Sequence, residues 1–322
     1  MILLSLLLSM AAMIVAAEVF TNAVEWLGHR LRLGDSATGS VLAAVGTALP
    51  ETLVPIVALA GGGEGAHAVT VGAILGAPFM LATVALFLSG AAAVLFRGLR
   101  HSNLELDLAT TRQDAGVFLL MFALLVTSTA LPAGWPRWLV AAALLASYGW
   151  YVRRLLTSGP AHAATPRRLY FGGSSPRVGV IVLQLLLSIG LLAAAAHYFV
   201  GAIESVAAVL GLPLLALSLL LVPLATELPE KFNSIIWLHR RQDTLALGNI
   251  TGAMVFQTAI PGSVGLLFTD WRLDSFSWLT AGFTLAAMLA LWTWLATHPK
   301  LPAAVLLPNC GFYLLFAALV LR

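Results

Sequence analysis

Two copies of one short motif place a carboxylate inside apolar sequence. The first runs from Gly46 to Glu51 (Gly-Thr-Ala-Leu-Pro-Glu) and the second from Ala225 to Glu230 (Ala-Thr-Glu-Leu-Pro-Glu). An ionised glutamate inside a bilayer is costly unless it faces a partner, a cavity or an ion. Two equivalent glutamates, Glu51 and Glu230, therefore predict the path of a transported cation.

Each motif glutamate directly follows a proline, Pro50 or Pro229. A proline inside a helix removes one backbone hydrogen bond and leaves a carbonyl of the preceding turn without its donor. In a membrane that carbonyl needs another partner, and a bound cation is one. We expect carbonyls of residues 43–47 and 222–226 to serve this purpose. The alternative is a proline kink stabilised by neighbouring helices.

The similarity between the two halves extends well beyond the motifs. Residues 17–51 align with residues 196–230 without a gap, and Gly72–Ala77 matches Gly248–Ala253 further on. Similarity over such a length indicates an internal duplication.

The composition excludes an ordinary soluble domain. Of 322 residues, 60% are hydrophobic and 10% are charged, whereas soluble domains have about 25% charged residues. Apolar runs of about the length needed to cross a bilayer predict an all-α integral membrane protein with ten transmembrane helices. They lie near residues 1–20, 37–60, 68–95, 115–131, 137–156, 179–203, 207–237, 245–268, 275–296 and 302–321.

The ten helices divide into two repeats of five. We expect a first repeat at 1–156 with its motif region at 46–81, a cytoplasmic linker at 157–178, and a second repeat at 179–322 with its motif region at 225–257. Because five spans is an odd number, the second repeat must be inverted in the membrane. Inverted repeats place the substrate site at their interface near the midplane.

Arginine and lysine residues predict the orientation. If the linker is cytoplasmic, most of the arginine and lysine residues lie on the cytoplasmic side, including Arg153, Arg154 and Arg168. This predicts a multi-pass protein of the cell (inner) membrane with both termini outside. We expect residues 1–19 to be a retained helix and not a cleaved signal peptide. The apolar stretch has no Lys or Arg ahead of it, and its end aligns with internal sequence near Ala196.

Several other classes of protein are disfavoured. The net charge of +3 comes without a basic stripe with interleaved aromatic residues, so no nucleic-acid partner is expected. The single cysteine, Cys310, excludes a disulfide framework. The sequence contains no nucleophile-elbow, zinc-protease or phosphate-loop motif. We therefore predict that the protein is not an enzyme and that it needs no cofactor.

The paired Leu-Pro-Glu motifs and the glycine-rich segments that follow them resemble the two α-repeats of the sodium/calcium exchanger family, within the cation/Ca²⁺ antiporter superfamily. The resemblance implies that Glu51 and Glu230 are central Ca²⁺ ligands, with Thr47 and Thr226 contributing oxygens. Ca²⁺ itself prefers about six to eight oxygen ligands, including carboxylates. The expected partners are inorganic cations and the lipid bilayer, and the choice between monomer and homodimer is open.

The chain departs from the family pattern where sodium-coupled members carry serine, asparagine or aspartate. Much of the sodium oxygen cage is therefore missing, which favours protons as the counter-ion, since carboxylates in a low dielectric bind protons more readily. The replacements are Ala48, Ala77 and Leu81 in the first repeat and Glu227, Ala253 and Gln257 in the second.

Four polar residues of the second repeat are candidate accessory or coupling residues. Glu227 and Lys231 are four apart in the favourable order for a helical salt bridge, which would make Lys231 a tethered cation in place of sodium. Alternatively, Lys231 extends to the interface. Gln257 and Asn249 are expected to face the motif, and Asn249 alternatively caps a helix break.

Polar residues on the first and sixth predicted helices have two interpretations. Glu18, Asn22, Glu25, His197 and Glu204 either line access paths or are hydrated and paired with neighbours.

The sequence thus predicts a secondary active antiporter that exchanges a divalent cation, with Ca²⁺ favoured, for protons. One alternative is a Na⁺/Ca²⁺ exchanger. Another is a transport-inactive membrane sensor or binding protein. Other hard divalent ions such as Mn²⁺ accept the same oxygen ligands.

Overall fold

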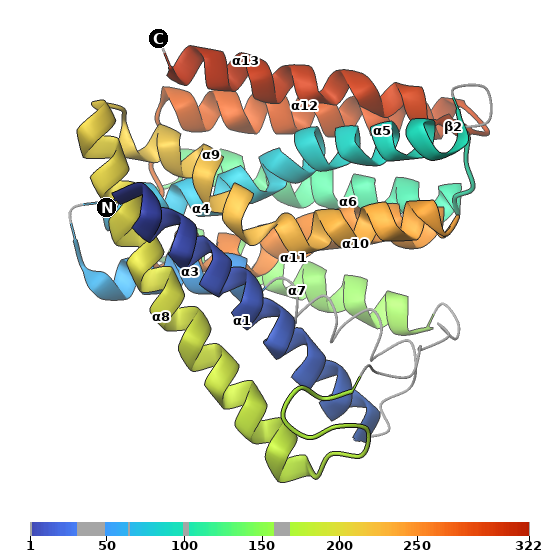
Figure 1. Cartoon of the computed structure of the whole chain (residues 1–322). Helices are drawn as coiled ribbons and strands as arrows, with labels where there is room; N and C mark the ends of the chain where they lie inside the picture. Colours follow the sequence, from blue (N-terminus) through green and yellow to red (C-terminus); the bar gives the residue numbers. More distant parts are fainter. Residues whose placement is uncertain (1, 31–48, 64, 99–102, 158–167, 322) are drawn as a thin grey trace.

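The computed structural model describes residues 2–30, 49–63, 65–98, 103–157 and 168–321. Apart from one short antiparallel pair of strands, β1 and β2, the regular structure of these residues is helical (Figure 1). The elements are α1 (Ile2–Arg30), α3 (Leu49–Gly61), α4 (Ala66–Met80), η2 (Leu81–Ala85), α5 (Leu86–Arg97), β1 (Asn103–Leu104), α6 (Leu108–Thr127), η4 (Ser128–Ala130), α7 (Trp135–Thr157), α8 (Val178–Leu210), α9 (Leu214–Thr226), α10 (Leu228–His239), α11 (Asp243–Phe268), α12 (Ser275–Thr297), β2 (Leu301–Pro302), η5 (Ala303–Asn309) and α13 (Cys310–Val320).

The predicted membrane fold is confirmed. Within the described ranges, seven helical segments are long and apolar enough to cross a bilayer, and two shorter apolar segments accompany them, Glu51–Gly61 and Leu214–Thr226. The continuous segment Ala66–Arg97 is the third predicted span, and α9 with α10 forms the seventh. Residues 37–48 of the second span lie outside the described residues.

The two repeats pack into one another. Helices α1 and α8, the first helix of each repeat, lie side by side at one side of the molecule, and Figure 1 shows them crossing the ends of the other helices at an angle. Helix α4 of the first repeat packs against α9 of the second, and α11 of the second packs against α6 and α7 of the first. Helix α11 also packs against α3, α4 and α10, so it contacts helices that carry parts of both motif regions.

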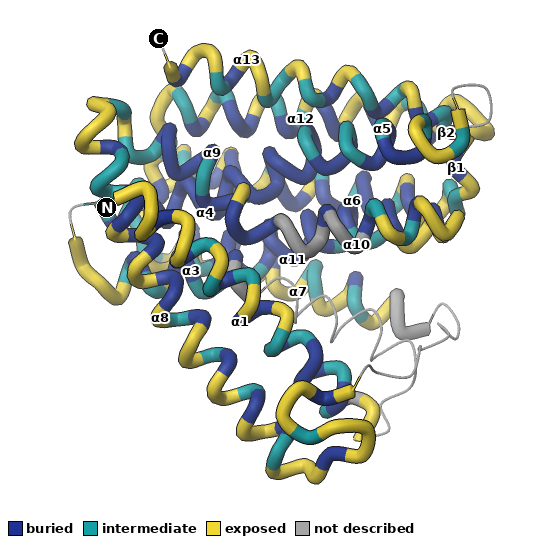
Figure 2. The backbone as a smooth tube through the Cα atoms, in the orientation of Figure 1, coloured by how far each residue is buried: buried dark blue, intermediate teal, exposed yellow. Residues whose placement is uncertain are grey.

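Glycines of the repeat segment bring α4 and α9 together. A Cβ atom on Gly72 would lie 2.5 Å from the Cβ of Ser218, and one on Gly76 would lie 2.6 Å from the carbonyl oxygen of Leu219. Small residues allow such close backbone approach in membrane helices. Figure 2 shows the result, since α4 is almost entirely buried whereas α1 and α8 alternate between buried and exposed residues.

A buried ion pair joins the end of the third span to the start of the eighth. Arg97 donates to Asp243 Oδ2 at 2.7 Å and to the Leu238 carbonyl at 2.8 Å, while the backbone N–H of Glu105 also donates to Asp243. Breaking one partner of such a pair leaves an uncompensated buried charge. This contact therefore fixes one end of α11 relative to α5.

Candidate functional site

The seventh span breaks at the second motif. Helix α9 ends at Thr226, Glu227 leaves the helical conformation with φ −87° and ψ 0°, and α10 begins at Leu228 with Pro229 in its first turn. Pro229 has no N–H to donate to the carbonyl of Ala225. The break thus interrupts the series of backbone hydrogen bonds inside the apolar span, as the proline of the motif predicts.

The two motif glutamates lie in the first turns of α3 and α10. Glu51 is buried, with 3% of its surface exposed. A helix N-terminus favours a carboxylate. The side chain of Glu230 and the whole of Thr47 lie outside the described residues, so a site shared by Glu51 and Glu230 stays a prediction. Thr226 is buried and donates its hydroxyl to the Val222 carbonyl at 3.2 Å.

Glu227 and Gln257 meet at the break. The Gln257 amide Nε2 donates to Glu227 Oε1 at 2.5 Å, and both side chains are fully buried. Among the described residues, the amide oxygen of Gln257 has no hydrogen-bond partner. An oxygen of α11 therefore lies beside the motif and is available to a cation.

Lys231 is buried between α10 and α4. Its side chain is 4% exposed, and Nζ lies 3.3 Å from the sulfur of Met80 at the end of α4. The alternative in which Lys231 extends to the membrane interface is therefore wrong. A buried ammonium requires compensating charge, and the salt bridge with Glu227 stays a prediction.

Asn249 faces α10. Its amide Nδ2 lies 3.5 Å from the hydroxyl of Ser234, which in turn donates to the Ala246 carbonyl at 3.2 Å. The alternative in which Asn249 caps a helix break is wrong, because α11 runs without interruption from Asp243 to Phe268.

Three of the residues that replace the oxygen-bearing residues of sodium-coupled family members have apolar side chains. Ala77, Leu81 and Ala253 are all buried. Leu81 also begins a π-helical turn, Leu81–Ala85, which sequence reasoning missed although Pro78 signals a disturbed ladder just before it. Such turns occur frequently at functional sites.

A cavity of about 490 Å³ lies between α1, α3 and α8. His197 and Glu204 of α8 line it together with Val57 and Ala58 of α3. This placement fits the access interpretation for those two residues. Glu18 and Asn22 instead pair with neighbours.

Glu18 and Asn22 contact the end of the linker. Glu18 accepts a hydrogen bond from the Tyr170 hydroxyl at 3.0 Å, and the amide oxygen of Asn22 accepts one from Gln184 of α8 at 3.1 Å. These contacts join α1, α8 and the described end of the linker.

The helix arrangement and the motif positions can be compared with known proteins. A model of the sodium/calcium exchanger protein family matches residues 1–157 and 180–322. The chain belongs to this family. It is a family of transporters, and the family predicted from the motifs is confirmed.

Two solved structures of exchangers share the fold over nearly the whole chain. One is that of the H⁺/Ca²⁺ exchanger CAX, with a TM-score of 0.77, 19% identity, and coverage of 100% of this chain and 82% of that one. Another is that of the sodium-calcium exchanger NCX_Mj, with a TM-score of 0.63, 19% identity and coverage of 98% and 97%. At these identities the similarity establishes the fold, which is that of two inverted five-helix repeats.

A curated relative matches over a shorter length. It is named "Putative antiporter CaxA", from Alkalimonas amylolytica, and is 31% identical over 91 residues. The match spans 28% of this chain and 28% of that protein.

Proposed function

We propose that the protein is a secondary antiporter that moves a divalent cation, with Ca²⁺ favoured, across the cell membrane in exchange for protons. The observation that carries this proposal is the break of the seventh span in the second motif, where the side chains of Glu227, Gln257 and Lys231 are buried. Irregular backbone at membrane depth is tolerated where it lines a cavity or an ion path.

The two motif carboxylates account for the divalent ion. Glu51 and Glu230 supply the two negative charges that neutralise Ca²⁺, and Thr47, Thr226 and the Gln257 amide supply neutral oxygens. Without the cation, two ionised carboxylates would face each other in a low dielectric. Two ionised carboxylates without a bound cation are too costly for the return step of the exchange cycle. We therefore expect Glu51 and Glu230 to be protonated in that step.

Residues of both repeats account for sodium as the weaker counter-ion. Ala77, Leu81 and Ala253 present carbon where sodium-coupled relatives present oxygen. Lys231 places a fixed positive charge close to Glu227 in sequence and beside α4 in space. The H⁺/Ca²⁺ exchanger CAX shares this fold, so the fold is compatible with proton coupling.

We further propose that α1 and α8 move together across the helices that carry the motifs. They pack closely on one another, and the cavity lined by His197 and Glu204 lies where α8 meets α3. In the proposed orientation the linker is cytoplasmic and both termini lie outside, which reporter fusions at each end would test.

The decisive experiment is Ca²⁺ flux in proteoliposomes with separately imposed Na⁺ and pH gradients. We expect a pH gradient alone to drive Ca²⁺ movement, with weak or no dependence on Na⁺. Flux driven by Na⁺ with the pH gradient collapsed, and none driven by pH, would identify a Na⁺/Ca²⁺ exchanger instead. Calcium binding without flux under either gradient would identify a sensor or binding protein.

A further inference from the structure

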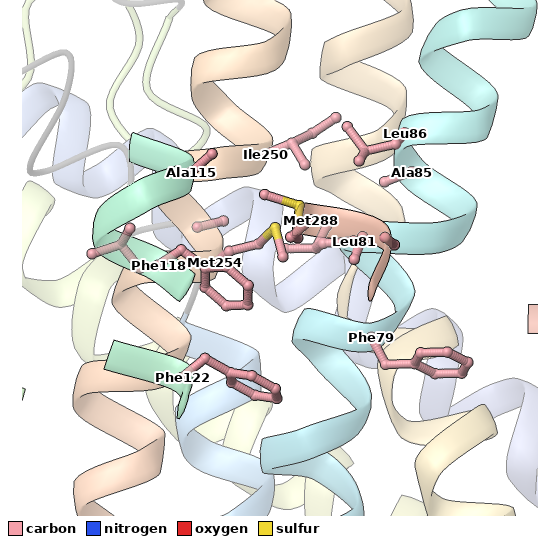
Figure 3. Close-up of a cluster of buried hydrophobic side chains, with 14 of the residues drawn as sticks. Phe79, Leu81, Ala85, Leu86, Ala115, Phe118, Phe122, Ile250, Met254 and Met288 are labelled. Carbon is pink, nitrogen blue, oxygen red and sulfur yellow. The ribbon is translucent and has the colours of Figure 1, made fainter. Parts of the chain in front are cut away.

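A buried carboxyl group lies away from both motifs, on α6. Asp114 is 4% exposed and belongs to a helix that forms one of the membrane spans. The next residues of this helix form an apolar contact with α11, and Figure 3 shows Ala115 and Phe118 beside Ile250 and Met254. Asp114 therefore lies at one end of the α6–α11 interface.

Two hydroxyl groups from other helices face this carboxyl group. Thr251 Oγ1 of α11 lies 3.2 Å from Asp114 Oδ2, and the hydroxyl of Tyr151 of α7 lies close enough to interact with Asp114. Both residues are buried. A Cβ atom on Gly252 would lie 3.6 Å from the Tyr151 hydroxyl, an ordinary van der Waals distance, so Tyr151 lies directly against α11. Three helices thus contribute to one polar cluster.

The number of hydrogens in the cluster indicates the protonation state of Asp114. Thr251 has one hydroxyl hydrogen but two acceptors within 3.2 Å, the Leu247 carbonyl at 3.1 Å and Asp114 Oδ2 at 3.2 Å, and a third, the Gly248 carbonyl, at 3.5 Å. An ionised Asp114 can only accept, so one of the two contacts would lack a hydrogen. A protonated Asp114 donates to Thr251, Thr251 donates to Leu247, and Tyr151 donates to Asp114. The two shorter Thr251 contacts, at 3.1 and 3.2 Å, then each have their own hydrogen.

The surrounding charges are few. Among the described residues, the charged groups near Asp114 are Asp107 at the start of α6 and Arg154 on the exposed end of α7, while Arg112 of α6 is exposed. Tyr148 lies behind Tyr151 with its ring centre 6.4 Å away. Helix α12, which also packs on α6, contains no ionisable side chain. A neutral acid is the less costly form of a carboxyl group in such surroundings.

We propose that Asp114, Tyr151 and Thr251 form a second proton-binding site, in which a protonated Asp114 joins α11 to α6 and α7. The site is separate from the exchange at Glu51 and Glu230, which does not use Asp114. Loss of this proton leaves a buried carboxylate and one Thr251 contact without a hydrogen. Because α11 also carries Gln257, we expect weakening of this interface at alkaline pH to slow exchange.

Infrared spectroscopy of the purified protein tests the protonation directly. We expect the carbonyl band of a protonated carboxyl group at neutral pH, its loss in Asp114→Asn, and its persistence in Glu51→Gln. Thr251→Val removes the acceptor of the Asp114 proton and should shift the frequency of the band. If Asp114→Asn does not fold, the Thr251→Val shift decides the question. An unchanged band in whichever of Asp114→Asn and Thr251→Val fold would overturn the proposal.

Transport measurements test the consequence. Asparagine mimics the neutral acid, so Asp114→Asn should keep wild-type Ca²⁺ flux at neutral pH and retain it at alkaline pH, where the wild-type rate falls severalfold. Glu18→Gln, with an exposed side chain, is the matched control and should follow the wild-type profile. Superimposable pH profiles for wild type and Asp114→Asn would contradict the link to exchange, whereas loss of flux in Glu51→Gln concerns the motif site alone.

Discussion

The glycine-rich helices of the two repeats, α4 and α11, share a backbone pattern but differ in chemistry. Gly72–Ala77 aligns with Gly248–Ala253, and both helices are largely buried. In the first repeat, Ala73 and Leu75 of α4 and Leu81 of η2 are buried and apolar, whereas Thr70 of α4 is buried and polar. In α11 the equivalent positions carry polar side chains: Asn249 for Ala73, Thr251 for Leu75 and Gln257 for Leu81.

The same difference separates the two motifs. Both keep Pro and Glu, but Glu227 and Lys231 stand in the second repeat where Ala48 and Thr52 stand in the first. The duplicated features are those that build the break and the paired carboxylates. The added polar groups lie on α10 and α11, which pack against each other, or at the break just before α10. We infer that the first repeat shapes the site and the second adjusts its charge.

The largest expected effect tests what the repeats have in common. Glu51→Gln and Glu230→Gln should each abolish cation exchange, because glutamine keeps the shape but removes a charge that compensates the divalent ion. Flux in proteoliposomes measures this, with Glu18→Gln as the control that keeps its activity. Near wild-type flux in either folded variant would refute the assignment of that glutamate.

A second prediction concerns the packing of the first repeat. Gly76→Ala should lower the yield of folded protein and its thermal stability, since the new methyl group would lie 2.6 Å from the backbone oxygen of Leu219. Overpacking of this kind costs about 1–3 kcal/mol. Gly190→Ala is the matched control, since no described atom outside its own helix backbone and chain neighbours would lie within 4 Å of the added methyl group. Equal melting temperatures for the two variants would show that α4 and α9 separate more easily than this packing implies.

The sequence predicts the repeats, the ten spans and the break at Glu227 because each of these depends on local pattern. Apolar run length determines the spans, and Pro229 determines the break. The sequence leaves the position of Lys231 open, because whether a lysine is buried depends on which helix lies opposite. The Asp114–Thr251 contact joins helices distant in sequence and no motif marks it, so only the fold brings it into view.

A third prediction concerns a substitution that gives the eighth span a residue of the third span. Gln257→Leu, which copies Leu81 of the first repeat, should reduce flux because Glu227 loses the Gln257 donor while it stays buried. An unsatisfied buried acceptor costs about 1–3 kcal/mol. Gln257→Glu and Gln257→Asn separate the loss of the amide from a change in volume. Unchanged flux in Gln257→Leu would show that the contact has no part in exchange.

The smallest expected effect tests the added charges. Lys231→Ala should change the apparent Ca²⁺ affinity severalfold and alter its pH dependence, because Glu227 is then no longer restrained by a neighbouring ammonium and can join the ligand shell. The maximal rate should change less than the affinity, since both motif glutamates remain. Initial rates at several Ca²⁺ concentrations and pH values separate the two parameters.

The double variant Glu227→Ala/Lys231→Thr gives the second motif the chemistry of the first. If the two charges act as a pair, removing both should disturb affinity less than removing Lys231 alone, because neither charge is left without compensation. The pH dependence of the double variant should then reflect the motif glutamates and Asp114 only. The single variants Glu227→Ala and Lys231→Thr complete the comparison, and additive effects of these two would instead show that Glu227 and Lys231 act independently, so that the restraint of Glu227 by Lys231 would have to be abandoned.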